Sequence, residues 1–360
     1  IIPKIEVWKI KEGIRTLLET LTNIDIKSLT KEQLREIEQK PKSKFSKILD
    51  KVILFLPVFS IILALLEYYY VPNYGNNLIT DVYGIFLGAQ LIIFLVLGIL
   101  SFFIKRVYYR IRHIAPFATF VYILLLLYDY ATLKSNTLLL PYFPWVDNIL
   151  NAMLTDQAYL LDCIKNSLKL LFTGYFWGVL IGLITGIACG YSKIVSYWIS
   201  PFMKLLGAIP SITWIPVIMV FASSLFKGAV IVIALGVWFS VTMSSYTGIK
   251  NIDVSYYEAA KTLGASERQL ILNIAIPSAL PHIFQGLVMG MSTACVSLLA
   301  AEMIGVESGL GWYITWQRGW AKFSNMYGAI IIICIIFVVV NFALGYIRKK
   351  VLKWQEGVIQ

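Results

Sequence analysis

The run MYGAIIIICIIFVVVNFALGYI, residues 326–347, contains no Asp, Glu, Lys, Arg or His side chain. A bilayer core about 30 Å thick is crossed by roughly 20 residues of α-helix. In hydrocarbon each backbone N–H and C=O needs a partner, and a helix supplies these partners within one segment. The run therefore predicts a membrane-spanning helix.

Seven further apolar runs predict helices of the same kind. They are residues 52–71, 82–104, 114–128, 170–190, 205–226, 228–249 and 283–301. The chain is 58% hydrophobic and 14% charged, with a mean hydropathy of +0.74, whereas soluble domains are about 25% charged. The composition excludes an ordinary soluble domain, and we expect an all-α integral membrane protein, a polytopic bundle of about eight transmembrane helices.

The basic residues predict the orientation of this bundle. The chain has 31 Lys and Arg against 20 Asp and Glu, a net charge of +11. With both termini placed inside, 25 of the 31 basic residues fall on the inner side, as the positive-inside rule requires. We therefore expect a multi-pass protein of the cytoplasmic (inner) membrane with both termini in the cytoplasm. The bilayer and its orientation explain the positive charge without a nucleic acid partner.

The segment before the first span has a different composition. Ile14, Leu17, Leu18 and Leu21 have the spacing of an amphipathic helix, and a second helix is expected up to Pro41. Residues 1–50 are thus predicted to form a cytoplasmic helical region that rests on the bundle or the lipid headgroups, or that regulates the protein. No cleavable signal peptide is expected. The predicted domains that follow are a transmembrane hairpin over 51–113, a core over 114–347 and a basic cytoplasmic tail over 348–360.

The cytoplasmic loop from 250 to 282 predicts two short helices. Asp253 is a good N-cap for the first, and Gly264 stands where a left-handed C-terminal cap belongs. Ser266 and Gln269 form a capping box for the second. That helix should reach Ile274 and end because of Pro277 and Pro281. Three side chains are expected to anchor this compact knob in a groove of a soluble partner: Leu263, Leu270 and Ile271.

Part of this loop resembles a known signature. Glu258-Ala259-Ala260, with Gly264 six residues after the Glu, and then Ile274, Ile276 and Pro277, resembles the EAA signature of permease subunits of binding-protein-dependent ABC importers. Ile276 takes the place of the usual Leu. The resemblance implies that the loop is the coupling helix that docks into an ATP-binding subunit. The implied coupling residues are Glu258, Ala259, Ala260, Leu263, Gly264 and Pro277.

Two other stretches narrow the resemblance. GAIPSITWIP at 207–216, and AAEMIG at 300–305 followed by SGLG at 308–311, look like the permeases of the nitrate, sulfonate and taurine group. The resemblance covers about 114–347 and implies a six-helix type I ABC importer core. The group usually has six spans, so the two spans at 52–71 and 82–104 are additional.

The resemblance also implies partners. These are two ATP-binding cassette ATPase subunits, an extracytoplasmic solute-binding protein and a second permease copy, which would form a homodimer. The chain has no GxxxxGK[ST] run, so ATP and Mg²⁺ are expected on the ATPase. No cofactor, metal site or catalytic residue is expected in the chain itself. The implied solute is small, polar and anionic: nitrate, a sulfonate, taurine, bicarbonate or similar.

Small residues recur at every fourth position in two spans. The residues are Gly178, Gly182, Gly186 and Gly190 in one, and Gly286, Gly290 and Ala294 in the other. Such stripes let helix backbones approach closely in lipid. The contact could lie within one chain or between two copies.

Polar residues inside two spans are candidates for a translocation path. Ser211, Thr213 and Trp214 lie between two prolines, Pro210 and Pro216. The prolines indicate either a packed kink or a path lining. A second polar stripe comprises Ser292, Thr293 and Ser297. Such hydroxyls also bond their own helix backbone, which is the alternative.

Glu302 lies at the end of a span, where an acid is costly unless it is paired or wetted. It is predicted to hold an external gate or line the path, or else to be an interfacial acid. Trp312, Trp316 and Trp320 recur every fourth residue after it. They indicate an interfacial helix or a docking surface for the binding protein.

Two other classes of protein remain as alternatives. A secondary transporter would need intramembrane acids or histidines, and Glu302 suits that role. An integral membrane enzyme would need a metal-ligand cluster or a catalytic set. Against the enzyme, His113 and His282 are isolated and the four cysteines form no CxxC pair.

Overall fold

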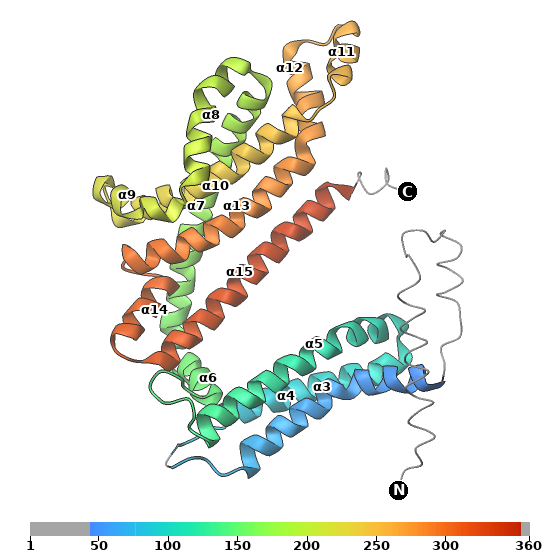
Figure 1. Ribbon diagram of the computed structural model, residues 1–360, viewed down its shortest axis with the longest axis vertical. Helices are drawn as coiled ribbons and strands as arrows, with labels where there is room; N and C mark the ends of the chain where they lie inside the picture. The colour runs from blue at the N-terminus through green and yellow to red at the C-terminus, as the bar shows by residue number, and fades with distance from the viewer. Residues whose placement is uncertain (1–43, 76, 354–360) are drawn as a thin grey trace, which may run out of the picture. The chain divides into compact units, whose positions relative to one another are not determined.

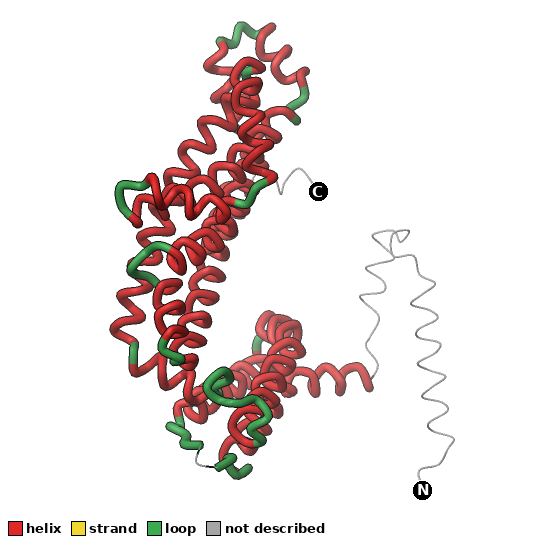
Figure 2. Tube along the Cα trace, turned by 60° about the vertical axis from the view of Figure 1, so that its left-hand side comes forward, coloured by secondary structure: helices red, strands yellow, loops and turns green. Residues whose placement is uncertain are grey.

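The computed structural model describes residues 44–75 and 77–353, and this part of the chain is helical without a strand (Figures 1 and 2). The helices predicted in residues 1–41 lie outside the described residues. The elements are α3 (Lys44–Tyr70), α4 (Val82–Phe103), α5 (Lys105–Asp129), η2 (Tyr130–Lys134), α6 (Val146–Thr155), α7 (Gln157–Tyr191), α8 (Lys193–Ala208), η3 (Ser211–Trp214), α9 (Ile215–Phe221), α10 (Leu225–Lys250), α11 (Val254–Thr262), α12 (Glu267–Gln269), η4 (Leu270–Ala275), α13 (Ile276–Ile304), α14 (Leu310–Gly319) and α15 (Phe323–Val351).

Seven helices within the described residues are long and apolar enough to cross a bilayer, and a bent helix pair raises the number to eight. The all-α membrane fold with about eight spans is therefore confirmed. The predicted span 205–226 is interrupted, as its prolines indicated, but its first half begins earlier, at Lys193. The chain forms Lys193–Ala208 and Ser211–Phe221, which meet at 96°. The break comes at Ile209, which is extended (φ −111°, ψ 116°), because the residue before a proline is disfavoured in the α region.

The predicted proline end of the coupling loop is wrong. The second short helix continues through the π-helical turn η4 into α13, so that Glu267–Ile304 is one long helix. Pro277 directly follows the π-helical turn η4, in the first turn of α13, and the changed hydrogen-bond register at this turn accommodates the missing N–H. Pro281 is accommodated inside the helix.

The chain divides into two compact units. In the first, residues 44–60 with 93–121, the ring of Phe55 packs 6.2 Å from that of Phe102. The second unit comprises 61–92 and 122–353 and includes α7 to α15. The predicted domain boundaries at 50, 113 and 347 stay predictions.

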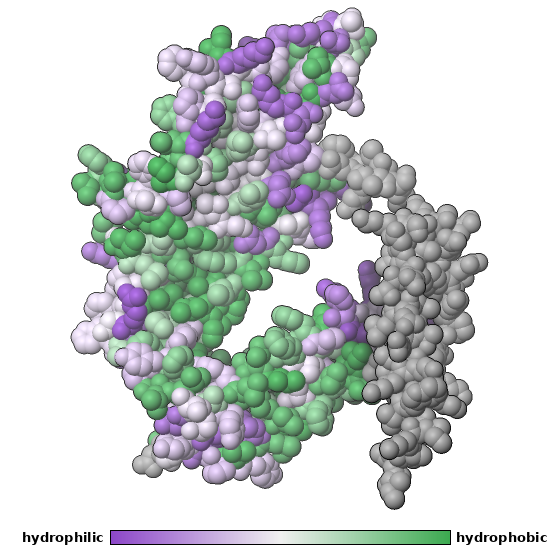
Figure 3. All heavy atoms as spheres, in the orientation of Figure 1, coloured by the Kyte–Doolittle hydropathy of each residue, from purple (hydrophilic) through white to green (hydrophobic). Residues whose placement is uncertain are grey.

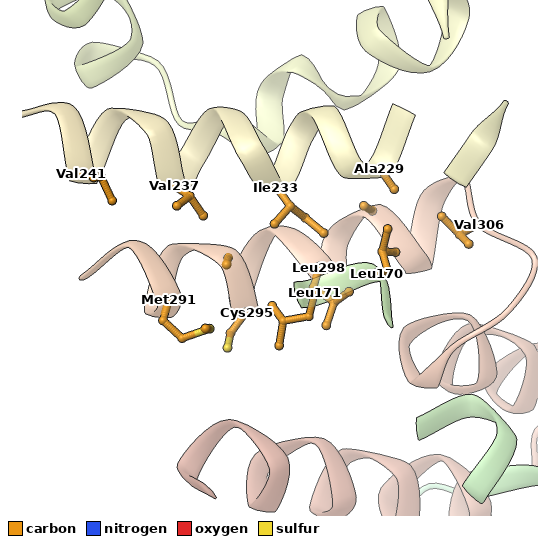
Figure 4. Close-up of a cluster of buried hydrophobic side chains, with 12 residues drawn as sticks. Leu170, Leu171, Ala229, Ile233, Val237, Val241, Met291, Cys295, Leu298 and Val306 are labelled. Carbon is orange, nitrogen blue, oxygen red and sulfur yellow. The ribbon is translucent and has the colours of Figure 1, made fainter. Parts of the chain in front are cut away.

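Helix α10 forms the centre of the second unit, between α7 and α13. A Cβ at Gly178 of α7 would lie 2.6 Å from Cβ of Val237, and one at Gly286 of α13 would lie 2.6 Å from Cβ of Ser244. Both glycine stripes therefore pack within the chain against the same helix, and Val237 contacts glycines of both. Figure 4 shows the buried side chains of α10, Val241 to Ala229, pointing toward α13, whose Met291, Cys295 and Leu298 belong to the same buried cluster.

Candidate functional site

The coupling loop begins with a capped helix. The backbone N–H of Ser255 donates to Oδ1 of Asp253 at 2.9 Å, so the predicted N-cap of α11 is confirmed. This hydrogen bond to the charged form holds the pKa of Asp253 below its ordinary value. Hydrophilic side chains gather around α11 and α12, at the top of Figure 3.

Gly264 ends that helix in the predicted left-handed conformation, with φ +80°. The N–H of Ala265 donates to the carbonyl of Ala260 at 3.0 Å, and that of Gly264 to the carbonyl of Lys261 at 3.0 Å. These two bonds form a Schellman motif. No atom lies within 4 Å of the position that a Cβ would take, so the backbone conformation, rather than lack of space, favours glycine here.

The second capped helix is also confirmed. The N–H of Ser266 donates to Oε1 of Gln269 at 2.8 Å, and the reciprocal bond completes the capping box. The helix then runs through η4 as far as Ala275 and into α13. The loop is therefore rigidly continuous with a membrane-spanning helix.

The three expected anchors differ in exposure. Leu263 is 88% exposed, whereas Leu270 is 1% exposed and therefore cannot anchor a partner, which makes that prediction wrong. Ile271 is half-buried. Glu258 and Ala259 are exposed, and Ala260 and Pro277 are half-buried. The outer surface of the knob is thus built around Glu258 and Leu263.

Two tyrosines that the sequence analysis missed attach the knob to the bundle. The hydroxyl of Tyr191, at the end of α7, donates to Oε2 of Glu267. Its ring lies 6.5 Å from that of Tyr257 in α11, and Lys261 pairs with Glu267 at 3.8 Å. A movement of the knob is therefore linked to α7 as well as to α13.

Part of the predicted polar path comes together at one place. The hydroxyls of Ser211 in η3 and Ser297 in α13 lie 3.0 Å apart. Those of Ser240 in α10 and Thr293 lie 3.4 Å apart, and a Cβ at Gly236 would lie 2.9 Å from Oγ of Ser211. Ser240 was missed, although its spacing of one turn from Gly236 placed both on one face of a span.

The other predicted path residues lie elsewhere or lack partners. Ser292 faces α15, where its hydroxyl donates to Oδ1 of Asn341 at 3.3 Å. Thr213 is exposed. The indole nitrogen of Trp214 is buried without a hydrogen-bond partner among the described residues. The assignment of this group to a translocation path stays a prediction.

Glu302 is 1% exposed and caps the start of α14, so the alternative of an interfacial acid is wrong. Its Oε1 accepts from the hydroxyl of Ser167 at 2.6 Å, and its Oε2 from the N–H of Gly311 at 2.8 Å. Oγ of Ser167 in turn accepts from the N–H of Leu310 at 2.8 Å. One carboxylate thus joins α7, α13 and α14.

This arrangement explains the glycines of the SGLG stretch. Gly309 has φ +111°, and a Cβ there would collide with the carboxylate of Glu302. A Cβ at Gly311 would lie 2.8 Å from Cβ of Glu302. The AAEMIG and SGLG stretches are therefore two halves of one packed arrangement, in which glycines leave room for the acid.

The three tryptophans form a ladder beside this junction. The rings of Trp312 and Trp316 stack at 5.3 Å, and those of Trp316 and Trp320 lie 6.0 Å apart. They line a hollow of about 560 Å³ together with Glu307. Trp320 is 65% exposed. Both interpretations, an interfacial helix and a docking surface, stay predictions.

Comparison with known proteins matches residues 178–353 to the family described as the binding-protein-dependent transport system inner membrane component. The putative aliphatic sulfonates transport permease protein SsuC of Bacillus subtilis (strain 168) is 28% identical over 51% of this chain and 67% of its own length. The taurine transport system permease protein TauC of Escherichia coli (strain K12) is 27% identical over 56% and 74%. The nitrate import permease protein NrtB of Synechococcus elongatus is 30% identical over 41% and 53%.

Proposed function

Because residues 178–353 belong to the binding-protein-dependent transport system inner membrane component family, we propose that the chain is a permease subunit that is coupled to a separate ATPase through the loop from 250 to 282. The single observation that carries the proposal is the form of this loop. Two capped helices present Glu258 and the 88% exposed Leu263 at the surface. A large apolar side chain held out on a capped turn can fill a pocket of a partner as an aliphatic anchor.

The connections of the knob support a coupling role. It continues through η4 into α13, and Tyr191 attaches it to α7. Both helices pack through glycine stripes against α10. Because tightly packed helices shift as units rather than deform, a displacement of the knob is transmitted into the bundle.

The transport cycle follows from these parts. Two ATPase subunits bind ATP and Mg²⁺ on the cytoplasmic side, which is also the side of both termini. A solute-loaded binding protein docks outside. Closure of the ATPases moves the coupling loops of two permease copies, and the pair exposes its path alternately to either side.

The solute of this proposal is a small polar anion. The relatives are named for aliphatic sulfonates, taurine and nitrate. The first two contain a sulfonate group, and nitrate is itself an anion. The cluster of Ser211, Ser240, Thr293 and Ser297 is polar without a fixed charge, and the hydroxyls of Ser240 and Thr293 also donate to carbonyls of their own helices. Hydroxyls that must leave such bonds to reach a solute suit an anion that binds weakly enough to leave again.

Replacing Leu263 tests the coupling role. The full chain is co-expressed with the ATPase subunit of its importer and purified in detergent. Because Leu263 contributes almost no internal packing, Leu263→Asp should fold normally and bind the ATPase at least about tenfold more weakly.

Leu78→Asp is the matched control, because Leu78 is 81% exposed in the loop between α3 and α4. It should leave the complex and its ATP hydrolysis unchanged. A Leu263→Asp complex with normal affinity and normal stimulation of ATP hydrolysis would contradict the proposed coupling surface.

A further inference from the structure

Glu67 and Asp129 are buried acids in the part of the chain that precedes the family match. Glu67 is in α3, three residues before its end, and Asp129 is the last residue of α5. Asp129 is 0% exposed and Glu67 is 9% exposed. Both belong to the same compact unit. Burying an ionised carboxylate is costly unless a partner compensates its charge.

Neither acid has a hydrogen-bond partner for its carboxylate oxygens among the described residues, although the N–H of Val146 approaches Asp129. Lys134 attracts both acids electrostatically, but its ammonium donates to neither of them. The hydroxyl of Tyr83 is likewise without a partner there, on a side chain that is 0% exposed. Tyr83 interacts electrostatically with both Glu67 and Asp129, so the three unpartnered groups lie in the same region of this unit.

The neighbouring charged groups, by contrast, are fully partnered. The ammonium of Lys134 donates to the carbonyls of Tyr68 and Val71, each at 2.7 Å, and to Oδ1 of Asn73 at 2.8 Å. Asp147 accepts from the N–H of Thr80 at 2.6 Å and from that of Tyr83 at 2.9 Å. Two neutral donors here, the hydroxyl of Tyr68 and the indole nitrogen of Trp145, also lack a partner among the described residues, so Glu67 and Asp129 are the buried charged groups of this region that are left unpartnered.

The charges around this place do not balance. The titratable and charged groups that face it are Glu67 and Tyr68 from α3, Asp81 and Tyr83 at the start of α4, Tyr122 and Asp129 from α5, Lys134 from η2 and Asp147 from α6. Asp147 is compensated by N–H groups at the start of α4. Glu67 and Asp129 together carry two negative charges, and Lys134 supplies one positive charge. One further positive charge completes the balance.

We propose that Glu67, Asp129 and Tyr83 form a binding site for one positive charge, either a proton or a monovalent cation such as Na⁺. A proton would be covalently bound to one carboxylate oxygen and donated to an oxygen of the other acid, with no other bond broken. A monovalent cation would lie between carboxylate oxygens and the Tyr83 oxygen. Two carboxylates are too few for a divalent ion such as Ca²⁺, which takes six to eight oxygen ligands. The site does not depend on the proposed transport function, because all three residues precede the family match.

Labelling with dicyclohexylcarbodiimide tests the site in the full chain, purified in detergent. This apolar reagent enters membrane-embedded sites, and the O–H of a protonated carboxyl adds across its C=N bond. Peptide mass spectrometry should find the label on Glu67 or Asp129. Above the pH at which the shared proton is lost, labelling should fall about tenfold for each pH unit.

One partnered acid in the same chain is the internal control. Asp147 is 0% exposed, but its oxygens accept hydrogen bonds from Thr80 and Tyr83. It should stay unlabelled under the same conditions. A label on Asp147 as strong as that on Glu67 or Asp129 would overturn the proposal, because it would report entry of the reagent rather than a bound proton.

Labelling in the presence of NaCl, KCl or choline chloride distinguishes a bound proton from a bound metal cation. A label that these salts do not change identifies a proton. A label that is lost with Na⁺ or K⁺, but not with choline, identifies that cation. In the second case the midpoint of thermal unfolding should rise with the same ion in the wild type, and this rise should disappear in Glu67→Gln and Asp129→Asn.

The effect of Na⁺ or K⁺ on the unfolding midpoint is measured on the wild-type chain, so this test does not require the variants to fold. If neither acid is labelled between pH 5 and pH 9, and neither Na⁺ nor K⁺ changes the unfolding midpoint, the proposal is wrong.

Discussion

Two capped helices, α11 and α14, flank α13 in the chain, and their first turns are stabilised in opposite ways. On the side of the coupling loop, α11 is capped by Asp253, an exposed side chain that bonds an N–H two residues away. On the other side, α14 is capped by Glu302, a buried side chain that bonds an N–H nine residues away and a hydroxyl of α7. The first cap stabilises one short helix, whereas the second joins three helices.

This difference predicts how each end responds to change. An exposed local cap can be lost without disturbing the bundle, because water replaces it. A buried shared cap cannot be lost alone, since its removal leaves several polar groups unpaired in the interior. The coupling end is thus suited to contact a partner, and the Glu302 end to hold the bundle together.

Removing the buried cap should have the largest effect. Glu302→Ala leaves the hydroxyl of Ser167 without its acceptor and the N–H of Gly311 unpaired. At about 1–3 kcal/mol for each unsatisfied buried group, we expect the free energy of unfolding to fall by about 3 kcal/mol. Thermal or denaturant unfolding of the purified chain measures this loss.

Glu302→Gln is the matched control, because it keeps the shape and one acceptor oxygen. Its loss should be smaller than that of Glu302→Ala. Equal stability of Glu302→Ala and the wild type would show that the three helices do not need this carboxylate. Unchanged ATP-coupled uptake by Glu302→Gln would exclude a role for the charge in the transport mechanism.

Crowding the same cap should have the next largest effect. Gly311→Ala brings a methyl group to 2.8 Å from Cβ of Glu302 and 2.9 Å from the carbonyl of Leu299. Overpacking of a filled interior costs about 1–3 kcal/mol, so an unfolding free energy about 2 kcal/mol lower is expected. Gly319→Ala in the same helix meets no atom within 4 Å and should be neutral. Comparable losses in both variants would contradict a steric cause.

The two ends also differ in how far the sequence predicts them. Both caps of α11 and the capping box at Ser266 use partners within five residues, so local patterns sufficed and all were confirmed. The cap of α14 needs Ser167, whose position 143 residues before Leu310 carries no local signal. The spacing from Glu302 to Gly309 and Gly311 was visible, but not the packing that explains it.

The spans were predicted well, but the sequence did not show what each proline does to its helix. At Pro210 the predicted interruption is a complete break, with the two helices at 96°. At Pro277 the helix continued although a stop was expected. A helix continues through a proline only where a π-helical turn or a helix start leaves no partner waiting for the missing N–H. The packing of neighbouring helices decides whether such a turn forms. The unpartnered state of Glu67 and Asp129 was likewise invisible, because it depends on contacts between three helices.

At the coupling end, the C-cap should be more sensitive to conformation than to space. Gly264→Ala places an L-residue at φ +80° with no atom in contact, a backbone cost of about 1–2 kcal/mol. We expect this cost to loosen α11 locally, with faster amide exchange at Ala265 and weaker ATPase binding, while the unfolding midpoint of the bundle stays unchanged. Gly264→Asn should be milder, because Asn tolerates this region. A fall in the global midpoint as large as that of Gly311→Ala would remove the contrast between the two ends.

Loss of the N-cap should have the smallest effect and a defined pH dependence. The pKa of Asp253 is lowered in the folded chain by the Ser255 N–H, so the charged form is the one that stabilises. Its contribution is complete above the ordinary pKa of 3.8 and is lost as the pH falls through the lower folded value. Asp253→Ala should therefore speed amide exchange at Ser255 at pH 7 and leave the global unfolding midpoint unchanged. Asp253→Ser keeps a capping oxygen without the charge, so its exchange should stay slow and should lack the acid-dependent step. If exchange at Ser255 were equally slow in all three proteins, the exposed cap would contribute nothing, and α11 would depend on Tyr191 and Tyr257 for its position.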